Sequence, residues 1–210
     1  MSGLLVLGAG GHGKVVADAA LASGWQRIAF LDDRIDARTA RLGLEILGAT
    51  SDLGRHRTTF SAAAVAIGDA RRRLELLDAC REMGYELPSI VHPSAVVSRF
   101  ATLEPGCVAF AQCAVNADAV LGARCIVNTG ATIDHDCVLG RGVHVCPGAH
   151  LAGSVQVGER AWIGIGAVIR QGIAIGRDAI VGAGAVVVAD VSETAMVMGA
   201  PAKPREDVKT

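Results

Sequence analysis

The chain has 210 residues, enough for one large domain or two small ones, and 51% of them are hydrophobic. Its formal net charge is −1, so it lacks the basic surplus with which proteins hold nucleic acid or an anionic membrane. Only 3% of the residues are aromatic, whereas 26 are glycine, which indicates a core of short side chains packed at regular spacing.

The beginning of the chain and its cysteines indicate a reducing compartment. No basic segment precedes the apolar run at residues 4–7, so no signal peptide is predicted, and no apolar stretch is long enough for a membrane span. The chain has no Cys-x-x-Cys pair, and multiples of six residues separate four of its six cysteines: Cys107, Cys113, Cys125 and Cys137. We expect a cytoplasmic protein with reduced thiols at small packing positions.

Residues 1–88 alternate strand and helix patterns. A buried strand at 4–7 precedes a Gly-rich turn and a helix over 13–23, and further strands are expected at 28–31 and 64–67. A second helix begins after the last strand, with three arginines in its first turns: Arg71, Arg72 and Arg73. The alternation predicts a parallel sheet that binds ligands at the carboxyl ends of its strands.

The turn after the first strand matches a phosphate-binding pattern. Gly8, Gly10 and Gly13 form G-x-G-x-x-G, and the acidic residues Asp32 and Asp33 follow about 20 residues on. The segment is long enough for only one mononucleotide-binding half, which favours a sugar nucleotide over a dinucleotide. A helix N-terminus receives a phosphate in either case. A ligand-free structural turn is the third interpretation.

From Ile90 the chain divides into seventeen hexads without one insertion. The second position is always Val, Ile, Leu or Ala, and the sixth is always Ala, Cys, Val or Ile. An α-helix requires a period near 3.6, so a fixed period of six predicts short strands joined by identical corners, as in a parallel β-helix. Three faces, with one hexad on each, make one coil. We therefore expect an α/β domain at 1–88 and a β-helix with a C-terminal tail at 89–210.

Several segments together resemble one family over essentially the whole chain. They are GAGGHGKVV, LDD, AIGD, HPSA, NTGATIDHDC, HVCPGAHLAG and GAPAKP, in the order seen in the sialic acid O-acetyltransferase and bacillosamine or perosamine N-acetyltransferase family. The resemblance implies a Rossmann-like half domain that holds a nucleotide-linked amino sugar. It also implies a left-handed β-helix that forms a homotrimer and binds acetyl-CoA between neighbouring prisms.

The segment TIDHDC contains the expected catalytic base. His135 occupies the fourth place of its hexad, an outward-facing corner, and a neutral imidazole suits proton removal from an acceptor amine. An exposed corner residue is the alternative interpretation. The resemblance implies that Asp136 enhances the basicity of the ring, and Asp134 is the competing partner.

Gly153 follows His135 by three hexads, which is one coil. Its N–H is expected to stabilise the oxyanion of the acetyl group, a role that the resemblance also implies, whereas a plain corner glycine is the alternative. The resemblance further implies acetyl-CoA contacts for His144 near the thioester, for Ile165 and Ala183 along the pantetheine, and for Lys203 near the adenine. A solvated tail lysine is the alternative for Lys203.

Binding of the acceptor is expected in the first domain, and the resemblance of Asp32 and Asp33 to uridine-binding acids favours UDP over GDP. The expected substrate-binding residues are Gly10, Gly11, His12, Asp32, Asp33 and Gly68. No role is assigned to His150. No metal site is expected, because His135, His144 and His150 should not converge within one subunit, and Cys146 is not required as a nucleophile.

The sequence therefore predicts an N-acetyltransferase that transfers acetyl from acetyl-CoA to a nucleotide-linked 4-amino-4,6-dideoxy sugar by direct attack. Three rival hypotheses remain. A sialic acid O-acetyltransferase would use the same base on a hydroxyl. A sugar-nucleotide sensor would bind without catalysis. A carbonic anhydrase-like hexapeptide protein would require zinc.

Overall fold

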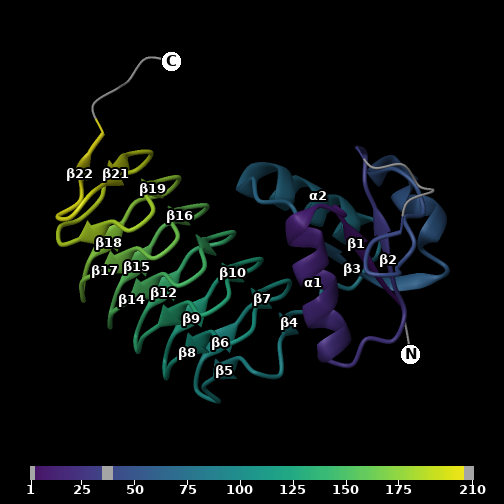
Figure 1. Cartoon of the computed structure of the whole chain (residues 1–210), viewed down its shortest axis with the longest axis horizontal. Helices are drawn as coiled ribbons and strands as arrows, with labels where there is room; N and C mark the ends of the chain where they lie inside the picture. The colour runs from purple at the N-terminus through teal and green to yellow at the C-terminus, as the bar shows by residue number, and fades with distance from the viewer. Residues whose placement is uncertain (1–2, 35–39, 206–210) are drawn as a thin grey trace. The chain divides into compact units, whose positions relative to one another are not determined.

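The chain consists of two compact units, Met1–Pro93 and Ser94–Thr210, in a computed structural model that describes residues 3–34 and 40–205. The first is a Rossmann-like α/β half domain and the second a left-handed parallel β-helix, as the sequence predicts. Figure 1 shows the helices of the first unit and the stacked coils of the second.

The first unit is built on a three-stranded parallel sheet with the order β2-β1-β3. Every residue of β1 and β2 is buried, as expected for parallel strands with both faces covered. The elements in chain order are β1 (Gly3–Leu7), α1 (Gly11–Ala22), β2 (Ile28–Leu31), the 3₁₀ helix η1 (Thr50–His56), β3 (Phe60–Val65) and α2 (Ala70–Glu82).

The third strand differs from the sequence-based prediction. It runs over Phe60–Val65 rather than 64–67, and its register on β1 pairs Leu7 with Val65. Alanine has a weak strand preference, so the local pattern did not mark residues 62 and 63, and pairing with the buried strand β1 determined their conformation. The first helix likewise begins at Gly11, two residues before the predicted start.

Each of the seventeen hexads from Ile90 onward contains a strand, β4 to β20, and two further strands follow the last hexad. The strands are β4 (Ile90–Val91), β5 (Val96–Val97), β6 (Thr102–Leu103), β7 (Val108–Ala109), β8 (Ala114–Val115), β9 (Val120–Leu121), β10 (Ile126–Val127), β11 (Thr132–Ile133), β12 (Val138–Leu139), β13 (His144–Val145), β14 (His150–Leu151), β15 (Gln156–Val157), β16 (Trp162–Ile163), β17 (Val168–Ile169), β18 (Ala174–Ile175), β19 (Ile180–Val181), β20 (Val186–Val187), β21 (Met196–Met198) and β22 (Lys203–Pro204).

These strands form three sheets, one on each face of the prism. The eight-stranded sheet has the order β22-β21-β19-β16-β13-β10-β7-β4, the six-stranded sheet β20-β17-β14-β11-β8-β5, and the five-stranded sheet β18-β15-β12-β9-β6. Within the repeat, pairing is parallel and in register between residues three hexads apart, as in Ile133 with Leu151. The coil of three hexads predicted from the sequence is therefore confirmed.

The hexad positions have fixed structural roles. The second residue points inward, as Ile133 and Leu151 do, and the small sixth residue is buried at the corner, as Cys137 is. The fifth residue has a positive φ at corner after corner, for example 59° at Asp118 and 57° at Asp178. Glycine, asparagine and aspartate tolerate this conformation best, which explains their frequency in the repeat.

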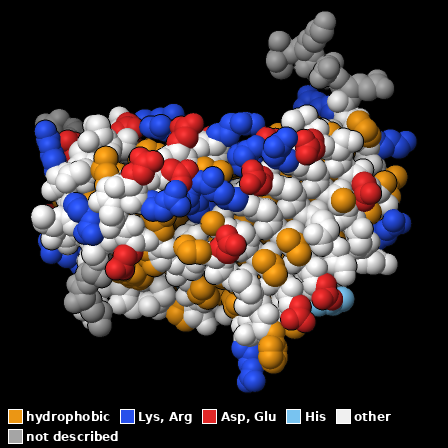
Figure 2. Space-filling view, turned by 180° about the vertical axis from the view of Figure 1, so that it is seen from behind, with side chains coloured by type: hydrophobic (Ala, Val, Ile, Leu, Met, Phe, Trp, Pro, Cys, Tyr) orange, Lys and Arg blue, Asp and Glu red, His pale blue; other side chains and the backbone are white. Residues whose placement is uncertain are grey.

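The surface carries charges of both signs. Figure 2 shows Lys and Arg side chains interspersed with Asp and Glu on the face in view, with small apolar patches between them. In the described part of the chain, no helix combines the length and apolar character needed to span a membrane.

Candidate active site

The turn between β11 and β12 holds the expected catalytic base at the corner between the six- and five-stranded sheets. His135 Nδ1 lies 2.6 Å from Asp136 Oδ2. The two side chains are 59% and 58% exposed, so both are accessible to a ligand. A hydrogen bond from Nδ1–H to the carboxylate leaves Nε2 as the basic atom and directs it away from Asp136.

The backbone explains why two consecutive residues form this pair. Asp136 occupies the fifth position of its hexad with φ 59°, in the left-handed region. An aspartate tolerates this conformation better than most residues. The structure thus brings Asp136 rather than Asp134 to the imidazole, as the resemblance implied.

Electrostatics favour the protonated form of this imidazole. The hydrogen bond to Asp136 raises the pKa of His135, and the charge of Asp134 raises it further. Asp134 itself contacts Asn116 Nδ2 and the His135 amide, both at 2.8 Å. These two hydrogen bonds lower the pKa of the Asp134 carboxyl, so it remains ionised at neutral pH.

Gly153 packs directly over the ring of His135. A Cβ added at residue 153 would lie 2.5 Å from His135 Cε1 and 2.6 Å from Nε2. Ser154 N donates to the His135 carbonyl at 2.9 Å, which joins the two coils at this corner. Only a glycine leaves room for the imidazole at this position.

The other two histidines lie on different sheets. His144, in the eight-stranded sheet, is buried, with Nε2 3.1 Å from Asn128 Nδ2 and its ring edge-on to Trp162. His150, in the six-stranded sheet, has Nδ1 2.8 Å from Thr132 Oγ1. Within residues 3–34 and 40–205, no three His, Cys, Asp or Glu side chains form a group able to hold a metal ion.

The residues expected along the cofactor are separate from His135 in this chain. Ile165 and Ala183 are exposed at the corner between the eight- and six-stranded sheets, whereas His135 and Gly153 occupy the corner between the six- and five-stranded sheets. Lys203 is exposed in β22, which pairs antiparallel with β21. A single subunit therefore does not bring the predicted catalytic and cofactor residues together.

The first unit has a cavity of about 540 Å³ at the carboxyl ends of its strands. The predicted residues Gly10, Asp32 and Asp33 line it. Asp32 Oδ2 accepts from Ala9 N at 2.6 Å, and Asp33 Oδ1 accepts from Thr50 N at 2.7 Å. Both acids therefore brace the loops around the cavity.

Three other predicted residues lie outside the lining of this cavity, namely Gly11, His12 and Gly68. Burial lowers the pKa of His12 to about 4, with a further contribution from Arg73, so the ring is neutral at physiological pH.

Sequence reasoning missed Arg34, Thr50, Asp69 and Arg72, which do line the cavity. Asp69 and Arg72 belong to the segment GDARRR after the third strand, and this cluster of charged residues at the end of a strand could have indicated them.

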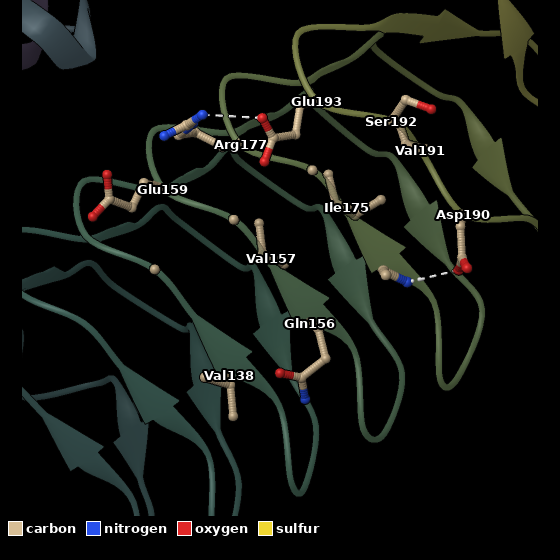
Figure 3. A pocket seen from close by; sticks show the side chains of 14 residues that line it. Val138, Gln156, Val157, Glu159, Ile175, Arg177, Asp190, Val191, Ser192 and Glu193 are labelled. Carbon is tan, nitrogen blue, oxygen red and sulfur yellow. Dashed lines mark hydrogen bonds and ion pairs between the residues drawn. The ribbon is translucent and has the colours of Figure 1, made fainter.

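A second hollow, of about 640 Å³, lies on the five-stranded sheet. Figure 3 shows Arg177 and Glu193 on one side of it and Asp190 on the other. Arg177 Nη2 is 3.1 Å from Glu193 Oε2, and Asp190 Oδ1 accepts from Ala174 N at 2.9 Å. None of the predicted catalytic residues lines this hollow.

The cysteines are packing residues, as expected. All six are buried and unpaired with one another by disulfides. Burial raises the pKa of Cys146 to about 12, which keeps its thiol protonated. A protonated, buried thiol is inert as a nucleophile.

A left-handed β-helix with an exposed imidazole–carboxylate pair at one corner defines the class of hexapeptide-repeat acyltransferases. Matches to three protein families agree with that class. The PglD N-terminal domain matches residues 3–80, the hexapeptide repeat of succinyl-transferase matches 115–147, and the bacterial transferase hexapeptide (six repeats) matches 154–189. No curated protein sequence matches the chain.

Solved structures narrow the class to one family. A histidine mutant of perosamine N-acetyltransferase from Caulobacter crescentus, in complex with CoA and GDP-perosamine, is 42% identical over 99% of this chain and 98% of its own, with a TM-score of 0.94. The acetyltransferase domain of PglB from Neisseria gonorrhoeae, in complex with acetyl coenzyme A, is 43% identical over 96% and 98%, with a TM-score of 0.92. WeeI from Acinetobacter baumannii is 27% identical over 98% and 100%, with a TM-score of 0.90.

The chain belongs to the family of hexapeptide-repeat sugar acetyltransferases that includes the perosamine N-acetyltransferase and the PglB acetyltransferase domain. It is therefore an acetyltransferase.

Proposed function

We propose that the protein transfers the acetyl group of acetyl-CoA to the amino group of a nucleotide-linked 4-amino-4,6-dideoxy sugar. The observation that carries this proposal is the exposed His135–Asp136 pair beneath Gly153, because a basic imidazole next to a bare backbone suits attack on a thioester. The relatives crystallised with CoA and GDP-perosamine or with acetyl coenzyme A support both substrates.

The reaction proceeds by direct attack in a ternary complex. The nitrogen of the acceptor amine attacks the thioester carbonyl while Nε2 of His135 takes a proton from it. Asp136 stabilises the imidazolium that forms. The N–H of Gly153 donates to the developing oxyanion. Collapse of the tetrahedral intermediate breaks the C–S bond, and the CoA thiolate leaves with the proton that His135 took from the amine, which restores the neutral imidazole.

No acyl-enzyme is required for this sequence of steps. The pKa of about 12 for Cys146, raised by burial, leaves too little thiolate for attack at neutral pH. The amine of the acceptor is itself the nucleophile, so His135 needs only to be basic and correctly placed.

The β-helix binds acetyl-CoA in this proposal, and a homotrimer completes the cofactor site. Ile165 and Ala183 would line the pantetheine, His144 would lie near the thioester, and Lys203 would contact the adenine end. Ile165 and Ala183 are at a different corner from His135, which supports a cyclic assembly in which a neighbouring subunit supplies them.

The first unit binds the nucleotide of the acceptor. Gly10, Gly11 and His12 surround the start of α1, where the N–H groups suit a diphosphate. Asp32, Asp33 and Gly68 belong to the loops after the strands. UDP is the nucleotide that the sequence favours, whereas the Caulobacter relative supports GDP as the second candidate.

One assay tests the proposal. Thiol release from acetyl-CoA is measured with UDP- and GDP-linked 4-amino-4,6-dideoxy sugars side by side, with the parent chain and with His135→Ala. We expect one acceptor to be acetylated on nitrogen, and we expect His135→Ala to lose roughly 10²–10⁴ in rate. A His135→Ala enzyme that works at the parental rate, or acetylation of a free sialic acid instead of either amino sugar, would overturn it.

A further inference from the structure

Asn116 is positioned one coil before Asp134. Strands β8 and β11 pair Ala114 with Thr132 and Val115 with Ile133, so the next residues of the two coils are adjacent. Asn116 Nδ2 donates to Asp134 Oδ1 at 2.8 Å. A side-chain hydrogen bond thus joins the coil of Asn116 to the turn that holds His135.

The same carboxylate oxygen also binds the backbone of the proposed base. Asp134 Oδ1 accepts from His135 N at 2.8 Å, in addition to the bond from Asn116. The Asp136 carboxylate instead binds the imidazole. The two acids therefore have different partners: Asp136 holds the ring, and Asp134 holds the main chain from which the ring projects.

The exposure of His135 makes this support important. Its side chain is 59% exposed, so side-chain packing restrains the ring far less than it would in a core. The direction of its Cα–Cβ bond depends on the conformation of the turn. A main-chain anchor at residue 135 limits rotation of that turn.

We propose that Asn116 and Asp134 are positioning residues that hold the His135 turn in the geometry needed for proton transfer. The inference rests on the function proposed for His135. It predicts that Asn116, which belongs to another coil and whose side-chain amide binds Asp134, controls the reaction rate.

A second effect of Asp134 is electrostatic and is separable from the first. Its charge is the second cause of the raised pKa of His135, after the hydrogen bond that the ring donates to Asp136. Asp134→Asn keeps an amide oxygen that accepts from Asn116 and from the backbone but removes the charge. Asp134→Ala removes both.

The experiment compares four variants by kcat, KM and the pH profile of thiol release, with the acceptor used by the parent enzyme. Asn116→Ala and Asp134→Ala should each lower kcat about tenfold with little change in either KM, because the base is displaced. The double variant should lose no more than the worse single variant. Asp134→Asn should retain most of kcat and move the acid limb of the profile to lower pH.

Thr132→Val is the matched control. It removes the hydrogen bond to His150 between the neighbouring coils of the same sheet, and both pairs line one shallow hollow of about 350 Å³. We expect parental kcat for this variant. If Asn116→Ala does not fold, Asn116→Leu removes the donor at similar shape without adding a charge and should show the same loss.

Three results would overturn the inference: parental kcat in Asn116→Ala, single losses that multiply in the double variant, or an Asp134→Asn enzyme as impaired as Asp134→Ala. An inactive His135→Ala enzyme together with a fully active Asn116→Ala enzyme rejects this inference alone. An active His135→Ala enzyme rejects the proposed function.

Discussion

A Cβ built on Gly153 would lie 2.5 Å from Cε1 of His135, one coil away. The two residues are three hexads apart, and the in-register pairing of the six-stranded sheet places their corners on top of one another. The backbone of residue 153 and the imidazole therefore share one small space. This contact places a potential oxyanion donor next to the proposed base.

Gly153→Ala should therefore inactivate the enzyme without unfolding it. The added methyl group meets an exposed side chain that is able to swing away, so the coil is retained while the imidazole is displaced. We expect kcat to fall by roughly 10²-fold. Thiol-release kinetics and a thermal melt measure the two effects, and Ser154→Ala, the next residue, is the control. Parental activity in Gly153→Ala would contradict the arrangement.

Asp136→Asn should lower activity and shift its pH dependence. The hydrogen bond that His135 donates to Asp136 is the main cause of the raised pKa of His135, so its loss lowers that pKa toward the ordinary value. The active neutral imidazole then persists to lower pH, and the acid limb of kcat/KM moves in that direction. Because basicity and orientation are lost, we also expect a fall of about 10- to 10²-fold at neutral pH.

Asp118→Asn is the matched control for this variant. Asp118 occupies the same hexad position one coil earlier, with the same φ of 59° and an exposed side chain. Asparagine tolerates the left-handed conformation at both sites, so neither variant strains the backbone. An unchanged pH profile in Asp136→Asn, or an equal shift in Asp118→Asn, would argue against the assignment.

Arg72→Ala should weaken nucleotide binding. Arg72 lines the cavity of the first unit, and its guanidinium is exposed, with a long contact of 3.4 Å to Glu75. A diphosphate in the cavity would gain a charge-assisted hydrogen bond from it. Calorimetric titration with UDP and GDP should show about tenfold weaker binding. Arg71→Ala, outside the lining, is the control, and equal affinity in both variants would count against this cavity.

Asp178→Asn should destabilise the β-helix without changing the catalytic rate. Arg160 donates from Nε and Nη2 to the two oxygens of Asp178, each at 2.8 Å, and the two side chains are only 19% and 18% exposed. Loss of this shielded, bidentate pair should cost about 1–3 kcal/mol. Urea unfolding measures the change. Asp118→Asn is the control. Among the contacts of the described residues, Asp118 has no arginine partner, so this variant should unfold at the parental midpoint.

The hexad period alone established much of the second unit. A repeat of six determined the three faces, the inward second position and the coil of three hexads, so it also placed residue 153 over residue 135. Main-chain stacking in a parallel β-helix is regular, and sequence distance therefore converts directly into spatial distance. The expected outward placement of His135 is confirmed for the same reason.

Irregular parts of the chain required the tertiary structure. The resemblance implied Asp136 as the partner of the imidazole, but the residue spacing alone did not distinguish it from Asp134, because both are adjacent to His135. In the folded chain, the left-handed φ of Asp136 accompanies its contact with the imidazole, whereas the amide of Asn116, from another coil, binds Asp134. The lining of the nucleotide cavity by Thr50 and Arg34 likewise depends on loops that meet only after the sheet has formed.

The repeat thus determined where the candidate site lies along the prism, since every coil adds the same rise and rotation. Only the folded chain determined which oxygen contacts which nitrogen, since such contacts depend on turn dihedral angles and on side chains from neighbouring coils. The dihedral angles recur with the repeat, but the side chains at each corner and on the neighbouring coils differ, and the six-residue period carries no information about those side chains.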